Sequence, residues 1–177
     1  YQQIPFQYSI HLLNSPFDIL SHYEFLAIEG KDPRETLIKE LIKTIPDHAC
    51  IVVYNKRFEE SILLDLAEQF PKYSDELKKR AKHMIDLMIP FKNRDIYTAD
   101  MKGSYSIKAT LPALVPELSY DDLTINNGGI ATLKYQELAT INSADEKQQL
   151  KEALLEDCKQ DTYAMVKLVE ALQKLLK

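Results

Sequence analysis

The sequence has little cysteine and no hydrophobic run long enough to cross a membrane. Its 177 residues include two cysteines, Cys50 and Cys158, which lack the close spacing of a zinc knuckle and are too few for a disulfide framework. We therefore expect both thiols to be reduced and the protein to be cytoplasmic. Apolar stretches such as residues 48–54 are much shorter than the roughly 20 residues of a membrane-spanning helix, so we expect no membrane contact.

An excess of basic residues is also missing. The 22 Lys+Arg and 27 Asp+Glu leave a formal net charge of −5. This balance argues against a protein that coats nucleic acid regardless of sequence, which normally carries clustered lysine and arginine. It does not exclude a nuclease, whose site is itself acidic. With 45% hydrophobic and 28% charged residues, the composition is that of one folded domain over residues 1–177.

The order of apolar segments and turn signals predicts an α/β protein. The Asp-Pro-Arg-Glu sequence at 32–35 is typical of a helix start, with Asp32 as the N-cap, and Asn55 is expected to cap a second helix. We predict a mixed sheet flanked by helices. The expected strands are residues 4–13 and 23–28, forming a hairpin, and 49–54. The expected helices are 32–45, 56–70, 73–87 and 144–176, with a mixed segment at 93–119 and a loop at 126–129.

One acid lies on the apolar face of the second predicted helix. At about 100° per residue, Glu59 falls in the middle of the face formed by residues such as Phe58, Ile62 and Leu66. A carboxylate pointed at a core without a partner would cost several kcal/mol, which favours a nearby cation. The alternative is a first-turn acid that complements the helix dipole.

A second acid lies in the apolar stripe of the C-terminal helix. Asp161 shares that stripe with residues such as Leu154 and Leu168, and Asp157 lies one turn earlier on the same side. Two inward-facing carboxylates at this spacing repel each other unless a cation or a basic group lies between them. A buried pair satisfied by backbone N–H groups or by a lysine remains the alternative.

Together, Glu59 and Asp161 form a minimal set of ligands for a hard divalent cation. Mg²⁺ and Mn²⁺ prefer carboxylate oxygens, and two-metal phosphodiester hydrolysis holds its ions about 3.5–4 Å apart with bridging carboxylates. Two carboxylates are too few for such a site, so other ligands would have to come from elsewhere.

These residues also carry a resemblance to the DEDD group of RNase H-like 3′–5′ exonucleases. The sequence Tyr-Asn-Lys-Arg-Phe-Glu at 54–59 resembles the second motif of that group, and Cys-Lys-Gln-Asp-Thr at 158–162 resembles the third. Residues 103–108 are similar to the segment before a short helix near the substrate. The opening residues 1–9 and the sequence Asp-Pro-Arg at 32–34 resemble an uncharacterised bacterial family that carries such a domain at its C-terminal end.

The resemblance implies a metal-dependent nuclease whose first motif is not in this chain. That motif, a strand with an Asp-x-Glu pair, is expected just before Tyr1, so we interpret the chain as a fragment of a longer protein, with an upstream domain as a partner. Asp157 occupies the general-base position of the group, and Glu59 replaces the usual aspartate of the second motif. The fragment is therefore expected to be an RNase H-like domain without its first strand and inactive alone.

The resemblance also implies a nucleic-acid partner, DNA or RNA, with a single-stranded end as the expected place of binding. Asn55, Tyr105 and Lys108 are the expected substrate contacts, with Tyr105 stacking on a base and Lys108 binding a phosphate. The competing interpretation is a catalytically silent module that holds nucleic acid or a protein for the upstream domain. The identity of the residues just before Tyr1 would discriminate between the two.

Overall fold

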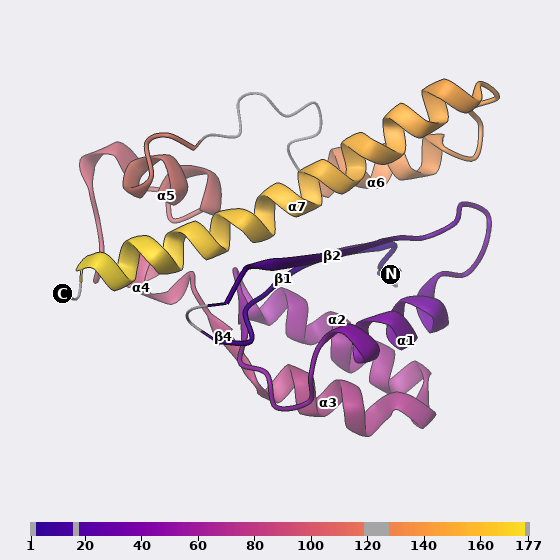
Figure 1. Cartoon of the computed structure of the whole chain (residues 1–177), viewed down its shortest axis with the longest axis horizontal. Coiled ribbons are helices and arrows are strands. Elements are labelled where there is room, and N and C mark those ends of the chain that lie inside the picture. Colours follow the sequence, from indigo (N-terminus) through magenta and orange to yellow (C-terminus); the bar gives the residue numbers. More distant parts are fainter. Residues whose placement is uncertain (1–2, 16–17, 119–127, 176–177) are drawn as a thin grey trace.

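The computed structural model describes residues 3–15, 18–118 and 128–175 and shows an α/β protein with two small sheets among its helices (Figure 1). Strands β1 (Gln7–Leu12) and β2 (Ser21–Leu26) form an antiparallel hairpin. Strands β3 (Ile51–Val53) and β4 (Met84–Asp86) pair in parallel. The expected α/β class and the hairpin are confirmed.

The expectation of one mixed sheet is wrong for the described residues, because the hairpin and the parallel pair are separate sheets. The two sheets share a hydrophobic core instead of hydrogen bonds. Tyr8 and Ile10 of β1 pack against the buried cluster that contains Val53 of β3. Apolar contacts therefore join the two sheets where a continuous ladder was expected.

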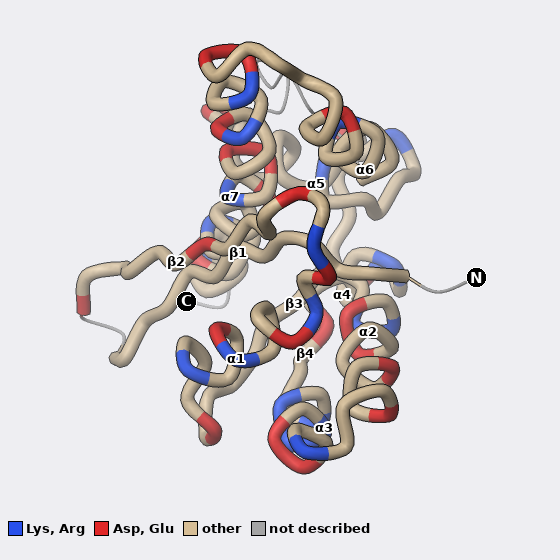
Figure 2. The backbone as a smooth tube through the Cα atoms, turned by 90° about the vertical axis from the view of Figure 1, so that its right-hand side faces the viewer, with Lys and Arg blue, Asp and Glu red and all other residues tan. Residues whose placement is uncertain are grey.

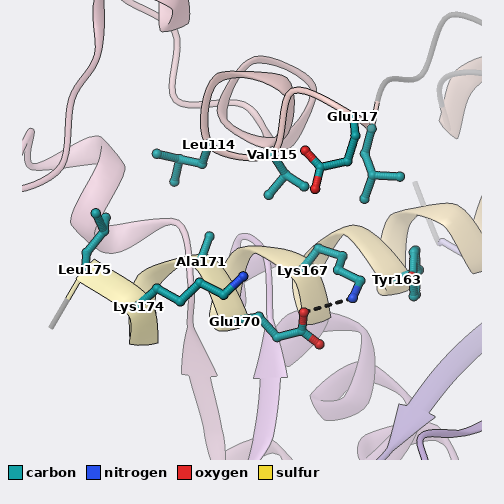
Figure 3. Close-up of a pocket in the computed structure, with 10 residues that line it drawn as sticks. Leu114, Val115, Glu117, Tyr163, Lys167, Glu170, Ala171, Lys174 and Leu175 are labelled. Carbon is teal, nitrogen blue, oxygen red and sulfur yellow. Dashed lines mark hydrogen bonds and ion pairs between the residues drawn. The ribbon is translucent and has the colours of Figure 1, made fainter. Parts of the chain in front are cut away.

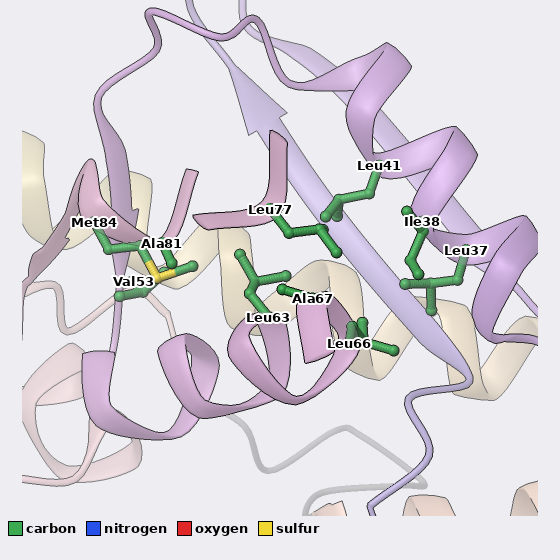
Figure 4. Packing of buried hydrophobic residues seen from close by; sticks show 10 residues of the cluster. All are labelled: Leu37, Ile38, Leu41, Val53, Leu63, Leu66, Ala67, Leu77, Ala81 and Met84. Carbon is green, nitrogen blue, oxygen red and sulfur yellow. The ribbon is translucent and has the colours of Figure 1, made fainter. Parts of the chain in front are cut away.

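Helices α1 (Arg34–Thr44), α2 (Lys56–Gln69) and α3 (Ser74–Lys82) surround this core (Figure 4). Leu66 is 2% exposed and Leu77 and Ile38 are fully buried, so each helix contributes at least one fully enclosed or nearly enclosed side chain. Burying a leucine of this kind stabilises the fold by about 1.5–3 kcal/mol. The expected helices at 32–45 and 56–70 are confirmed within one or two residues at each end.

The helix expected over residues 73–87 is wrong in its second half. A short 3₁₀ turn (Pro71–Tyr73) leads into α3, which ends at Lys82, and β4 follows. The spacing of Leu77, Ala81 and Met84 fits a helical face, so periodicity alone could not separate the two elements. Pairing with β3 decides that this segment is a strand. The carbonyl of His83 accepts a hydrogen bond from the N–H of Ile51, and the N–H of Leu87 donates one to the carbonyl of Val53.

The C-terminal part is helical and is organised by one long helix. Helix α7 (Ala144–Leu175) contacts β1, α5 and α6, and its expected range is confirmed as far as Leu175. The other elements of this part are α4 (Ile89–Lys92), the 3₁₀ helix η2 (Ala99–Met101), α5 (Ile107–Leu114) and α6 (Gly128–Glu137).

The loop expected at 126–129 is partly wrong, since Gly128 and Gly129 open α6; residues 126 and 127 lie outside the described part. None of the helices in the described ranges is both long and apolar enough to cross a membrane. Acidic and basic residues are interspersed along α7 (Figure 2), as expected for a solvated helix face, whereas α3 carries Asp75 and Glu76 in its first turn and basic residues such as Lys79 in its last.

Candidate functional site

The site begins at the N-terminus of α2, where an aspartate from β4 binds the backbone. Asp86 accepts hydrogen bonds from the N–H groups of Asn55 (3.1 Å), Lys56 (3.0 Å) and Met88 (2.9 Å). Its negative charge also faces the positive end of the α2 dipole. Strand β4 thereby fixes where α2 starts.

Asn55 does not cap the helix with its side chain, contrary to the sequence prediction. It occupies the N-cap position in a left-handed conformation (φ 73°), and its side chain makes no capping hydrogen bond. The Asp86 carboxylate supplies the missing acceptor. The Asn55 side chain is exposed beside this turn. Its expected contact with a substrate stays a prediction.

One turn into α2, Glu59 is half-buried and has a raised pKa. Burial is the main cause, and the negative charge of Asp161 adds to it. The two acids come from different helices far apart in the sequence. The structure therefore brings together the two residues that the helical pattern singled out.

Asp157 is the most buried acid of this group. It is 5% exposed, and burial together with the charge of Asp161 raises the pKa of its carboxyl group to about 6. The positive charge of Lys108, on α5, acts in the opposite direction. Lys108 thus lies within electrostatic range of Asp157, and its expected role as a phosphate contact stays a prediction.

Cys158 shows how closely the acids gather. Burial raises the pKa of its thiol to about 12, and the charges of four carboxylates add to the effect. These belong to Asp161, Asp157, Glu59 and Glu24, in order of decreasing influence. Sequence reasoning missed Glu24 of β2. The signal that could have found it is the alternation of side chains along a strand. Glu24 pairs with Ser9 in the hairpin, so the two side chains lie on the same face, and Ser9 is hydrogen-bonded to Thr162 of α7.

The loop before α5 is tied to the end of β3. The Tyr54 hydroxyl donates a hydrogen bond to the Tyr105 carbonyl (2.7 Å) and lies 3.1 Å from the hydroxyl of the fully buried Thr110. The Tyr105 ring is itself 45% exposed. The loop is therefore held by its backbone while an aromatic side chain faces solvent.

The described residues only partly fit a hard divalent cation. The negative charges of Glu59 and Asp161 repel each other, and a bound cation would relieve that repulsion. No three His, Cys, Asp or Glu side chains in the described part are arranged to hold a metal ion. A complete site would need ligands beyond these.

A groove of about 510 Å³ lies between the C-terminal ends of α5 and α7 (Figure 3). Apolar residues such as Leu114, Val115 and Ala171 line it, and the ion pair of Lys167 and Glu170 (2.8 Å) lies along it. None of the expected site residues lines this groove. Its size alone therefore does not mark it as the functional site.

Helices and strands from distant parts of the chain thus define an α/β protein with an acidic cluster at the junction of the hairpin, α2 and α7. The chain belongs to a family described as a domain of unknown function, DUF2779, which matches residues 1–106. That range includes Glu59 and Tyr105 but not Asp161.

One relative is an uncharacterized protein, UU173, from Ureaplasma parvum serovar 3. It is 30% identical over an alignment of 169 residues, and the match covers 82% of this chain. The chain spans 24% of that relative's length. No solved structure matches the chain.

Proposed function

We propose that this chain is part of a metal-dependent nuclease that hydrolyses phosphodiester bonds of DNA or RNA from a 3′ end. The observation that carries the proposal is the approach of Glu59 on α2 to Asp161 on α7, close enough for the charge of one to raise the pKa of the other. Like charges gathered at a partly buried place are costly, so they are typical of functional sites.

The arrangement of the strands supports an RNase H-like sheet that lacks one strand. Each two-stranded sheet has edges without a partner among the described residues, and the two sheets contact one core. The β3 sequence is uncharged and apolar, which is unusual for an edge strand in water. An additional strand between β1 and β3 would join both pairs into one mixed sheet.

Such a strand would also supply the acids that the site lacks. The resemblance expects an Asp-x-Glu pair on it, and alternate residues of a strand point to the same face. Both carboxylates would then face the same side of the sheet. Together with Glu59 and Asp161 they would make a four-carboxylate site for Mg²⁺ or Mn²⁺.

Divalent ions at such a site lower the pKa of a bound water and stabilise the leaving oxygen. The residues of this chain would supply metal ligands, a proton acceptor and substrate contacts. Glu59 and Asp161 would supply carboxylate oxygens from two helices, and Asp157, with its pKa of about 6, could accept a proton near neutral pH. Lys108 would bind a phosphate, and Tyr105 would stack on an unpaired base.

The proposal is tested by comparing two forms of the protein. One is the present chain, and the other begins at least one strand earlier. Both are assayed for 3′–5′ degradation of single-stranded DNA and RNA with Mg²⁺ or Mn²⁺. We expect activity in the longer form only, and its loss in Asp161→Asn and Glu59→Gln with folding intact by circular dichroism.

Activity of the present chain that survives both substitutions would show that the site is wrong. Lys43→Ala, on the exposed side of α1, is the matched control and should leave the rate unchanged.

A binding module is the second candidate, and one observation favours it. Tyr105, on the loop that Tyr54 holds from behind, and Lys108, in the first turn of α5, are both exposed. A module of this kind would bind single strands without cutting them. Binding with steep salt dependence by an inactive longer form would make it the better account.

A further inference from the structure

A second group of polar side chains lies between the hairpin and α7, apart from the carboxylates. His11 of β1 and His22 of β2 are directly opposite in the antiparallel register. Both are half-buried, and their ring centroids are 4.6 Å apart with a tilt of 34°. Hydroxyl groups of Ser9 and Thr162 bond these rings and link the hairpin to α7.

One arrangement of protons satisfies all four of the hydrogen bonds that Ser9, His11, His22 and Thr162 make here. In this arrangement the Thr162 hydroxyl donates to the Lys159 carbonyl (3.1 Å), so its oxygen only accepts from the other groups. It therefore accepts from Ser9 (2.8 Å) and from Nδ1–H of His11 (2.8 Å). Since the proton of Ser9 is then used, the Ser9 oxygen accepts from Nε2–H of His22 (2.9 Å).

Each neutral ring keeps a lone pair on its other nitrogen. These are Nε2 of His11 and Nδ1 of His22, and neither has a hydrogen-bond partner among residues 3–15, 18–118 and 128–175. Burial, followed by the nearby charges of His22 and Lys159, lowers the pKa of His11 to about 4. His11 is therefore neutral, with its lone pair available, at any pH well above 4.

We propose that His11 and His22 together bind a divalent transition-metal ion such as Zn²⁺, through Nε2 of His11 and Nδ1 of His22. Imidazole nitrogens suit zinc, nickel and copper better than magnesium. With metal–nitrogen distances of about 2.0–2.1 Å, two imidazoles on one ion have centroids about 4.5–5.5 Å apart. The observed spacing of the two rings lies in that range.

The hydroxyls are the kind of support that metal-binding histidines have. A ligating histidine usually donates its other N–H to a fixed acceptor, which sets the tautomer and the ring orientation. Ser9 and Thr162 are such acceptors here, and Ser9 is only 9% exposed. The rings are therefore oriented before an ion arrives.

The surrounding charges are mixed. Glu24 lies 3.9 Å from Nε2 of His22 and favours a cation, whereas Lys159 opposes one. The described residues provide no third His, Cys, Asp or Glu for the ion, so water would complete its coordination. Two imidazoles select a different metal from the Glu59 and Asp161 carboxylates, so this inference does not depend on the proposed nuclease.

The test is calorimetric titration of the full chain with Zn²⁺, in a Cys50→Ser background because Cys50 is an exposed thiol. We expect one zinc per chain that millimolar Mg²⁺ does not displace. His11→Ala and His22→Ala should each weaken binding at least about tenfold, and Ser9→Ala about tenfold. His48→Ala, whose side chain is 88% exposed, is the matched control and should bind as the parent does.

A second measurement needs no substitution at the site. In nuclear magnetic resonance spectra of the ¹⁵N-labelled protein, Zn²⁺ should shift Nε2 of His11 and Nδ1 of His22. The proposal is overturned if zinc shifts only other histidine nitrogens. It is equally overturned if a folded His11→Ala/His22→Ala double variant binds zinc as tightly as the parent, or if the parent binds none.

Discussion

Asp161 on α7 raises the pKa of Glu59 on α2, although the two residues lie far apart in the sequence. Two carboxylates that disturb each other in this way destabilise the fold unless something offsets their charge. A pure packing role would favour apolar residues at both positions. The cost is therefore an argument for function, and it can be measured.

Asp161→Asn should stabilise the metal-free chain. It removes the charge of the Asp161 carboxylate, which relieves repulsion with Asp157 one turn earlier and with Glu59. Relief of like-charge repulsion at this helical spacing is worth about 0.2–0.5 kcal/mol on an exposed surface, and more where burial reduces screening. Thermal unfolding should show a midpoint raised by roughly 1–2 °C.

Glu156→Gln is the matched control on the same helix. Glu156 is 55% exposed and paired with Lys159, so its substitution should not raise the midpoint. A lowered midpoint in Asp161→Asn would mean that the carboxylate is satisfied within the chain and that the functional interpretation is wrong.

The raised pKa of Asp157 predicts a pH dependence of stability. Its folded pKa of about 6 lies above its ordinary value of 3.8, so the native state binds the proton more tightly than the unfolded chain does. The free energy of unfolding should therefore fall as the pH rises from about 4 to about 6. The loss is on the order of 2–3 kcal/mol and is complete above this range.

Asp157→Asn isolates this effect. The difference in urea unfolding free energy between variant and parent should grow in favour of the variant between pH 4 and pH 7. Other groups, such as His11 with its lowered pKa, titrate in both proteins and cancel in the difference. A difference that does not change with pH would contradict a raised pKa for the buried carboxyl group at this position.

How far the sequence alone predicted this arrangement depends on the kind of contact. The helical pattern placed Glu59 and Asp161 on inward faces, because periodicity reports which side of a helix is apolar. It could not report that the two faces meet, since that depends on how α2 and α7 pack. The resemblance supplied that expectation, and the geometry agrees with it.

Asp86 was missed for a different reason. Its role depends on strand β4, which a helical spacing of apolar residues concealed, and on the backbone N–H groups of a helix far earlier in the chain. Contacts between a side chain and a distant backbone leave no periodic signal. The separate sheets likewise could not be anticipated, because a short apolar run shows that a strand exists but not which strand it pairs with.

Asp86→Ala should destabilise the protein by about 1–3 kcal/mol, because three backbone N–H groups lose their acceptor. Chemical denaturation measures the loss. Asp86→Asn should cost less, since an amide oxygen can still accept. Asp100→Ala, at an exposed position in η2, is the control and should change stability by less than about 0.5 kcal/mol.

Equal stability of Asp86→Ala and the parent would show that the cap is not needed to hold α2. A loss as large in Asp86→Asn as in Asp86→Ala would instead assign the effect to charge rather than to the hydrogen bonds.

Lys108 and Tyr105 make different contributions to the proposed binding of a single strand, and the two can be separated. Lys108→Ala should weaken binding of an oligonucleotide and reduce the slope of log affinity against log salt by about 1, because one phosphate contact is lost. Tyr105→Ala should cost about 1–3 kcal/mol of stacking and leave that slope unchanged. Fluorescence anisotropy over a series of salt concentrations distinguishes the two patterns.

Tyr54→Phe completes this comparison. It removes the hydroxyl that donates to the Tyr105 carbonyl but leaves both proposed contact residues in place. If the loop must be held for Tyr105 to stack, Tyr54→Phe should weaken binding in the manner of Tyr105→Ala, with the salt slope unchanged. Lys43→Ala, on the exposed side of α1, serves as the charge control and should alter neither affinity nor slope. If Lys108→Ala and Lys43→Ala lower affinity equally, binding is a general response to positive charge, and the start of α5 is not the contact surface.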